Sequence, residues 1–255
     1  MPDPSPRGIA VYLAATRQPW AGALFAVPLL LAYEIGLHLL GSNPDDSRTG
    51  ADAWTRALLV NLGLTAPFVA PLLLILGLVA WHLLSKPRSP VRDPVGVWIG
   101  MMIESAIAAG LLFGIVQLAY PLLASFGAVL DRPMNRMLET AAQRTPEWTW
   151  EMIVRYMGAG IYEETLFRLM LFSGVRFLFR LGDYSERAAA VIAAAVSAAL
   201  FAAAHQIGME AINATLFLYR VLAGLYFAVL FHCRGFGVAV GAHAGYDILV
   251  GLILR

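Results

Sequence analysis

Charged residues are scarce in this chain. They make up 14% of its 255 residues, whereas about a quarter of a typical soluble domain is charged. Hydrophobic residues make up 59%, and the mean hydropathy is +0.69. A net charge of +1 leaves no general excess of basic groups, so nucleic acid is not an expected partner. The composition instead predicts an integral membrane protein whose main surroundings are the lipid bilayer.

Cysteine is almost absent as well. The single Cys233 excludes an internal disulfide, so the fold must be held by packing alone. Residues 1–17 are polar and contain proline, and the apolar stretch that follows is too long for the hydrophobic region of a signal peptide. We therefore expect no cleavable signal peptide. The chain also shows no internal repeat and no soluble domain.

Long apolar segments occur along most of the chain, and each is close to the ~20 residues that a spanning helix needs. They predict an all-α fold, a polytopic transmembrane helical bundle of seven or eight spans. The expected spans cover roughly residues 20–40, 64–84, 95–123, 148–179, 187–205, 214–231 and 236–254. Residues 53–62 are expected to form a short interfacial helix or a re-entrant eighth piece.

The charges of the predicted loops orient the bundle. Basic residues lie between the second and third spans and around the fourth-to-fifth connection, namely Lys86, Arg88, Arg92, Arg176, Arg180 and Arg187. The first connection is acidic, with Asp45, Asp46 and Asp52 against Arg48. Because positive loops stay in the cytoplasm, the N-terminus is expected there. We expect an integral protein of a bacterial inner (cell) membrane.

Adjacent acids occur in the fourth span, where ionisable groups are costly and usually functional. Glu164 and Arg168 are one turn apart and share a helix face, whereas Glu163 lies about 100° around the helix. Arg168 can therefore neutralise one acid and leave the other for proton transfer. The alternative is that both acids make only internal salt bridges, to Arg220 or Arg155.

The fifth span ends in a second pair. Phe201 and His205 are one turn apart, on a helix built largely of alanine between residues 188 and 204. Small residues let neighbouring backbones approach closely, which would bring His205 near a partner. The alternative is an interfacial or hydrogen-bonding histidine. By these boundaries His205 falls near a helix end and His243 near mid-span, so the fifth helix must be tilted or sunken, or residues 206–213 re-enter the membrane.

The last span has two distinct faces. Glycine recurs every four residues at Gly237, Gly241 and Gly245, a spacing suited to close helix packing. His243 and Asp247 share a face about 200° away from that stripe. One face is thus predicted to pack and the other to present an imidazole and a carboxyl group. The alternative is an Asp–His pair that only closes the bundle core.

Taken in order, the motifs Glu163-Glu164-x-x-x-Arg168, Phe201-x-x-x-His205 and His243-x-x-x-Asp247 resemble the CPBP family of intramembrane proteases. This family groups Rce1-type CAAX-prenyl endopeptidases with bacteriocin-processing proteins. The chain is expected to have three parts: residues 1–19 as an N-terminal cytoplasmic segment, 20–147 as N-terminal transmembrane helices, and 148–255 as the helices that the resemblance implies are catalytic. All three belong to one membrane domain.

The resemblance also implies residue roles. Glu163 would be the general base on a water molecule, assisted by His205, while His243 and Asp247 would stabilise the oxyanion. Glu164, Arg168 and Phe201 would support this geometry. The residues themselves agree with the chemistry, since amide hydrolysis needs a base and donors aimed at the developing negative charge. The substrate would be a protein or peptide that is lipidated or membrane-anchored, and no cofactor is expected.

Asp247 departs from many members of the family, which carry Asn at this position. An ionised Asp would repel an oxyanion. Asp247 is therefore either protonated, or it orients His243 so that the imidazole donates a hydrogen bond. The one-turn spacing of the two residues favours the second interpretation.

Two other functions fit the same residues. Glu163, His205, His243 and Asp247 are all possible zinc ligands, and a zinc-bound water could be the nucleophile. The H-E-x-x-H pattern of many zinc proteases is absent, which disfavours this alternative. A non-catalytic scaffold or transporter could also keep such a cluster for binding or proton relay. The two halves lack the internal repeat common in secondary transporters.

Overall fold

The computed structural model describes residues 8–40, 48–85, 93–130, 149–207 and 214–253, and within these ranges all regular structure is helical. The N-terminal helices are α1 (Gly8–Thr16), α2 (Pro19–Leu39), α3 (Gly50–Asn61), α4 (Val69–Leu84) and α5 (Pro94–Leu130). The C-terminal helices are α7 (Trp150–Glu164), η2 (Thr165–Phe172), α8 (Ser173–Leu181), α9 (Glu186–Ala204), α10 (Ala214–Arg234) and α11 (Phe236–Ile253). The all-α class is confirmed.

Most predicted spans coincide with a helix to within a few residues, and the predicted short helix before α4 is α3. Among the described residues, five helices are long and apolar enough to cross a membrane: α2, α5, α9, α10 and α11. The predicted number of seven or eight spans is therefore not confirmed. The helix α4 has only 16 residues. The predicted fourth span is divided into α7, η2 and α8, and it carries several charged groups.

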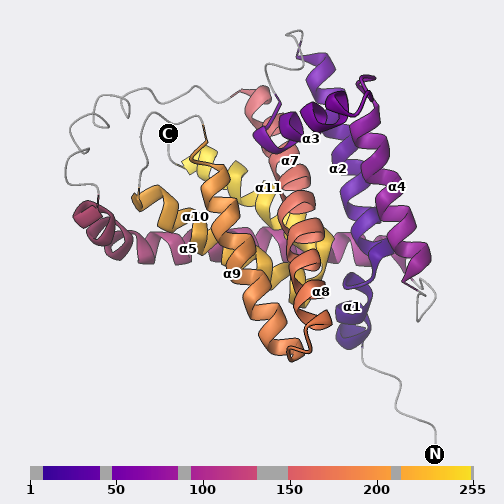
Figure 1. Ribbon diagram of the computed structural model, residues 1–255. Coiled ribbons are helices and arrows are strands. Elements are labelled where there is room, and N and C mark those ends of the chain that lie inside the picture. Colours follow the sequence, from indigo (N-terminus) through magenta and orange to yellow (C-terminus); the bar gives the residue numbers. More distant parts are fainter. Residues whose placement is uncertain (1–7, 41–47, 86–92, 131–148, 208–213, 254–255) are drawn as a thin grey trace, which may run out of the picture.

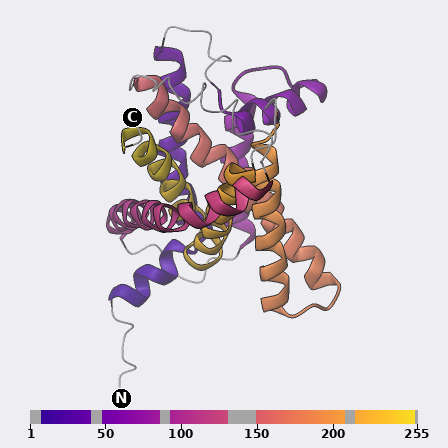
Figure 2. The same cartoon turned by 90° about the vertical axis from the view of Figure 1, so that its left-hand side faces the viewer.

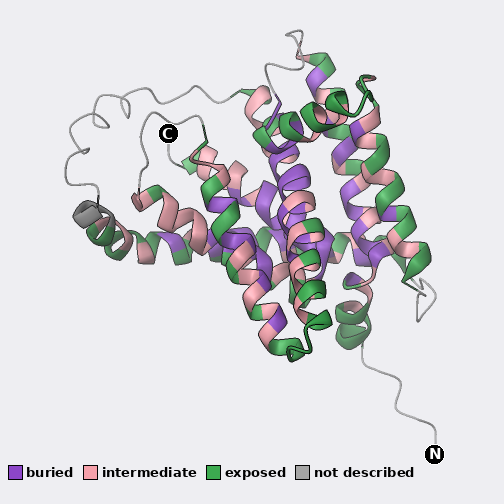
Figure 3. Ribbon diagram, in the orientation of Figure 1, coloured by how far each residue is buried: buried purple, intermediate pink, exposed green. Residues whose placement is uncertain are grey.

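α11 is the central helix of the described bundle. It packs against α5, α7, α10 and α2, so helices from both parts of the chain share one core. Figures 1 and 2 show α5 crossing the bundle transversely behind α7 and α11, whereas α2, α4 and α7 run side by side. Buried residues concentrate along this centre, and exposed residues cover the outer faces (Figure 3). Many of the exposed side chains are large and apolar, as expected for a surface in contact with lipid.

The glycine stripe of α11 packs as predicted. A Cβ atom at Gly241 would lie 2.7 Å from the Phe25 ring of α2, and one at Gly245 would lie 3.4 Å from Ala109 of α5. At the start of the helix, Gly235 has φ +93°, and a Cβ atom there would lie 2.5 Å from the Thr16 carbonyl oxygen. Glycine thus permits both the turn into α11 and its close approach to α5 and α2.

Asp52 is not the loop charge that the sequence predicts. It lies in the first turn of α3 and is completely buried, and its carboxylate accepts hydrogen bonds from Tyr33 and Arg48 at 2.8 Å and from Arg56 at 2.7 Å. Arg56 also pairs with Glu34 at 2.7 Å, so Glu34 is an interhelical partner. Asp52 therefore does not contribute to the loop charges from which the orientation was predicted. The other loop charges Asp45, Asp46, Lys86, Arg88 and Arg92 lie outside the described residues.

Candidate active site

Three helices bring the predicted motifs together. The continuous helix α7–η2 carries Glu163, Glu164 and Arg168, the end of α9 carries Phe201 and His205, and α11 carries His243 and Asp247. The distance between Glu163 Oε2 and the Nε2 atom is 3.5 Å for His205 and 3.8 Å for His243. The apparent difference in depth between the two histidines is thus resolved, because both rings reach the same carboxyl group.

The alanine-rich sequence of α9 explains how His205 reaches this point. Ser185 caps the helix by accepting a hydrogen bond from the Ala188 N–H, and alanine has the highest helix propensity. The small side chains let α10 approach so closely that a Cβ atom on Gly224 would lie 3.0 Å from Ala198 Cα. α9 ends at Ala204, with His205 as its C-cap residue. The predicted end of this segment is correct.

Glu164 and Arg168 form the predicted support pair. Glu164 Oε1 lies 3.0 Å from Arg168 Nη1, and both side chains are completely buried. Arg168 Nη2 donates to the Gly224 carbonyl oxygen at 3.1 Å, and its guanidinium lies 4.5 Å from the centre of the Phe201 ring. The pair therefore joins the helix of the acids to both α9 and α10.

Glu164 also holds His243. His243 Nδ1 lies 2.7 Å from Glu164 Oε1, and its ring stacks on Phe227 at 4.5 Å between centroids. The nearest carboxyl oxygen of Asp247 is 3.6 Å from His243 Nε2, so the closer partner of the imidazole is Glu164. The sequence did not reveal this arrangement, because a contact between α7 and α11 leaves no spacing signal. Phe227 was missed for the same reason.

His205 has a defined hydrogen-bonding arrangement. Its Nδ1 lies 2.8 Å from the carbonyl oxygen of Phe201. A carbonyl only accepts hydrogen bonds, so Nδ1 carries a proton, and in the neutral ring Nε2 has the lone pair. That lone pair faces Glu163. Arg220 Nη1 donates to the His205 carbonyl oxygen at 3.2 Å, which places Arg220 at the site.

The carboxyl group of Glu163 has an unsatisfied oxygen, as does that of Glu164, whose Oε2 also lacks a hydrogen bond with the described residues. Glu163 is buried, and its Oε2 forms no hydrogen bond with any part of the chain that the structure describes. Buried polar atoms are nearly always hydrogen-bonded, and exceptions are frequent at catalytic sites. The two histidine Nε2 atoms and Asp247 surround the same space. An atom bound there would lie within reach of an acid and two imidazoles.

Arg168 lies within a π-helical segment, Thr165–Phe172. Such segments are rare and are often found at functional sites. Hydroxyl groups donate to two carbonyl oxygens of this segment: Ser197 of α9 donates to that of Phe167 at 2.8 Å, and Ser173 donates to that of Arg168 at 3.3 Å. Within this segment Phe167 contacts Phe201 of α9 and Arg168 contacts Gly224 of α10, and sequence periodicity gave no sign of the π-helix.

Within the described residues, no group of three or more His, Cys, Asp and Glu side chains has an arrangement that could hold a metal ion. The geometry thus gives no support to the zinc alternative. The absence of a cofactor stays a prediction, which chelation and elemental analysis test.

Comparison with known families supports the motifs. Residues 145–249 match the family model Rce1-like, "Type II CAAX prenyl endopeptidase Rce1-like". The match covers about two-fifths of the chain and includes every residue of the three motifs. The predicted resemblance to CPBP proteases is confirmed, and this part of the chain is similar to the Rce1-like family. Comparison with curated proteins and with solved structures gave no match.

Proposed function

We propose that this Rce1-like membrane protein is an endopeptidase that hydrolyses a peptide bond with a water molecule activated by Glu163 and His205. The observation that carries the proposal is the position of Glu163 Oε2, which is buried, makes no hydrogen bond with the described residues and faces two imidazole Nε2 atoms. Buried, adjacent acids are costly in a membrane protein and need a functional reason.

The geometry supports the following activation step. A water molecule beside Glu163 Oε2 and His205 Nε2, within reach of both, would donate one hydrogen to each, since both are acceptors when the acid is ionised and the ring is neutral. Both hydrogens of the water are then engaged, and an oxygen lone pair is directed at the carbonyl carbon. Glu163 takes the proton as the C–O bond forms, and it returns that proton to the leaving amine when the C–N bond breaks.

The developing oxyanion needs a donor. In the imidazolium form of His243, Nδ1–H donates to Glu164 and Nε2–H is available to the oxyanion. A preorganised donor of this kind is worth about 10²–10³ in kcat. Glu164 thus orients His243, and Arg168 balances the charge of Glu164. Asp247, 3.6 Å from the same Nε2, lies beside the oxyanion position, where its protonated form would be a second donor.

The proposed substrate is a protein or peptide that is lipidated or membrane-anchored, because the site lies among membrane helices. The proposed location is a bacterial inner membrane with a cytoplasmic N-terminus, since the described basic residues Arg176, Arg180 and Arg187 lie around the α8–α9 turn.

The test compares peptides released by cells that produce the wild-type chain or the Glu163→Gln variant. Glu151→Gln is the matched control, since Glu151 lies on the same helix and its side chain is 42% exposed. Peptides with new termini should accumulate with the wild type and with Glu151→Gln, and be missing with Glu163→Gln. The same peptides in all three samples would refute the proposal.

A further inference from the structure

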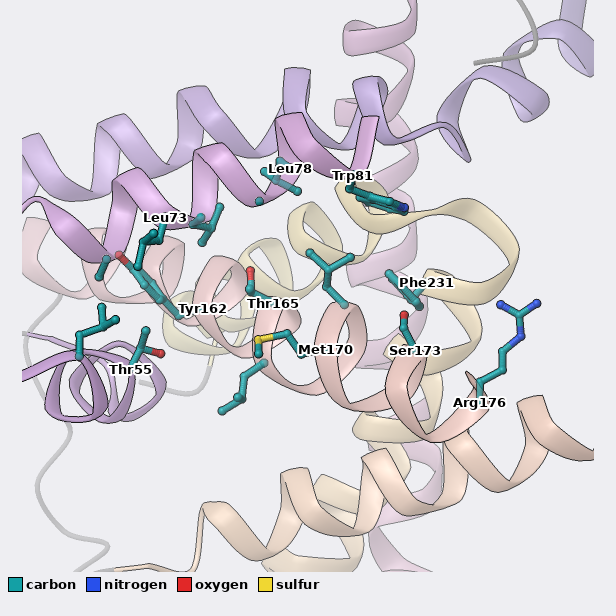
Figure 4. Close-up of a pocket in the computed structure, with 16 residues that line it drawn as sticks. Thr55, Leu73, Leu78, Trp81, Tyr162, Thr165, Met170, Ser173, Arg176 and Phe231 are labelled. Carbon is teal, nitrogen blue, oxygen red and sulfur yellow. The ribbon is translucent and has the colours of Figure 1, made fainter. Parts of the chain in front are cut away.

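A cavity lies behind the helix that carries the catalytic acids. It separates α4 on one side from η2 and α8 on the other, and α3 closes one end (Figure 4). Its volume is about 650 Å³, within the 300–1,000 Å³ typical of ligand sites. Most lining side chains are apolar, including Leu73 and Leu78 of α4 and Leu166 and Leu169 of η2. A hydrocarbon chain suits such a lining.

The cavity and the proposed active site lie on opposite faces of one helix. Tyr162, Thr165, Leu166 and Leu169 line the cavity, whereas Glu163, Glu164, Phe167 and Arg168 are directed to α9, α10 and α11. In helical projection the centres of these two sets are roughly opposite. A molecule in the cavity is therefore not placed for hydrolysis by Glu163, so the occupant is not the scissile part of a substrate.

The opening of the cavity indicates where an occupant would enter. Met170 and Leu73 line it from opposite sides, and their exposed fractions are 61% and 44%. Both belong to the apolar outer surface that the bilayer covers. The cavity is thus accessible from lipid.

One end of the cavity carries a basic residue, Arg176. Trp81 and Phe231 lie at the same end (Figure 4). Arg176 Nε lies 2.7 Å from Glu186 Oε1, and Arg180 Nε lies 3.5 Å from Glu186 Oε2. Two guanidinium groups therefore share one carboxylate, which leaves a net positive charge. Tryptophan and arginine are typical of the membrane interface, where lipid phosphates lie.

We propose that this cavity binds one acyl chain of an anionic phospholipid, whose phosphate lies beside Arg176. The chain extends between α4 and η2 toward Thr55, along the apolar lining. Guanidinium groups bind phosphate by charge-assisted hydrogen bonds, and basic pockets between membrane helices are recognised anionic-lipid sites. The bound chain packs against the back of the π-helical segment that positions Arg168.

Photo-crosslinking of the full chain in phosphatidylcholine vesicles tests this proposal. The vesicles contain a small fraction of phosphatidylglycerol with a diazirine near the end of one acyl chain, or phosphatidylcholine with the same diazirine. Labelled positions are mapped by mass spectrometry. Phosphatidylglycerol should label the cavity segments at residues 69–84 and 162–173 about fivefold more than phosphatidylcholine does. This ratio is the preference expected when one arginine at the interface attracts an anionic lipid.

Two variants fill the cavity. Gly77 lines it, and a Cβ atom there meets nothing within 4 Å, so Gly77→Phe places a ring in the cavity without a clash at the backbone. Gly114→Phe is the matched control, because Gly114 on α5 is equally open and does not line the cavity. Leu73→Trp is a second filling variant. Each variant is used for crosslinking only after it elutes from a size-exclusion column as a single folded species.

Cavity labelling should be lost in Gly77→Phe and Leu73→Trp and kept in Gly114→Phe. Arg176→Gln should abolish the preference for phosphatidylglycerol, whereas Arg155→Gln, at a half-exposed site on α7, should keep it. Equal labelling by the two lipids, or labelling unchanged by both filling variants, would overturn the proposal. Displacement of the label by a lipidated peptide but not by phosphatidylglycerol would assign the cavity to that peptide and also overturn it.

This experiment does not depend on hydrolysis. Labelling of the Glu163→Gln variant should equal that of the wild type. If the proposed peptidase function fails its own test, the proposal of a lipid site is therefore not affected.

Discussion

Replacing Arg168 by Met tests the internal support of the site. The substitution removes the partner of Glu164 at 3.0 Å, the hydrogen bond to the Gly224 carbonyl oxygen and the contact with the Phe201 ring. His243 then remains as the one ion-pair partner that the structure shows for this buried acid. Removing one member of a buried pair costs about 3–5 kcal/mol, because the other charge stays uncompensated.

Arg168→Met should therefore lower the free energy of unfolding by about 3–5 kcal/mol. The double variant Glu164→Gln/Arg168→Met removes both charges, and Gln still offers an oxygen to His243 Nδ1. It should be more stable than Arg168→Met alone. Arg155→Met is the control, since Arg155 is 49% exposed and its nearest atom lies 3.9 Å from Glu151, so its loss should cost under about 1 kcal/mol.

The assay is reversible unfolding in mixed micelles with increasing SDS, followed by far-UV circular dichroism. Two results would refute the reasoning. One is a cost for Arg168→Met no greater than that for Arg155→Met. The other is a double variant whose loss of stability equals the sum of the losses measured for Glu164→Gln alone and Arg168→Met alone. Either result would mean that the two buried charges do not depend on each other.

Three other predictions follow from the same geometry. Asp247→Asn should keep the cleavage rate within about tenfold of the wild type, because an amide at this position can donate a hydrogen bond. Asp247→Leu should lower kcat about 100-fold. Equal rates for the two variants would contradict this role. Strong chelators should leave the rate unchanged, and elemental analysis should find well under one zinc per chain; inhibition reversed by zinc would restore the metal alternative. Gly160→Val should destabilise the bundle, since its Cβ atom would lie 2.8 Å from the Val240 carbonyl oxygen, whereas Gly174→Val meets open space. Similar thermal unfolding of these two glycine variants would show that α7 and α11 are not so closely packed.

Helical periodicity was sufficient to predict much of the site. The pairing of Glu164 with Arg168 and the glycine face of α11 both depend on residues one turn apart. Such relations are fixed by helix geometry alone. The three motifs also sufficed for the Rce1-like resemblance.

Contacts between helices could not be predicted in this way. The hydrogen bond between Glu164 and His243 joins residues far apart in sequence, and no spacing rule encodes it. The sequence predicts that Asp52 lies in a loop, because it follows a polar segment. In the structure, hydrogen bonds from Tyr33 and Arg56 hold its carboxylate in the interior. The helix α1 was missed since residues 1–17 lack a long apolar run, and the π-helical segment was missed because local composition does not mark it.

The central claim is that Glu163 acts on the water molecule, and its most direct test is the cleavage rate of purified Glu163→Gln protein. The substrate is a peptide identified by comparison of the wild type with this variant, and Glu151→Gln serves as the control. We predict no measurable cleavage by Glu163→Gln, with unfolding like that of the wild type, and a normal rate for Glu151→Gln. Cleavage by folded Glu163→Gln at a rate near that of the wild type would contradict the account.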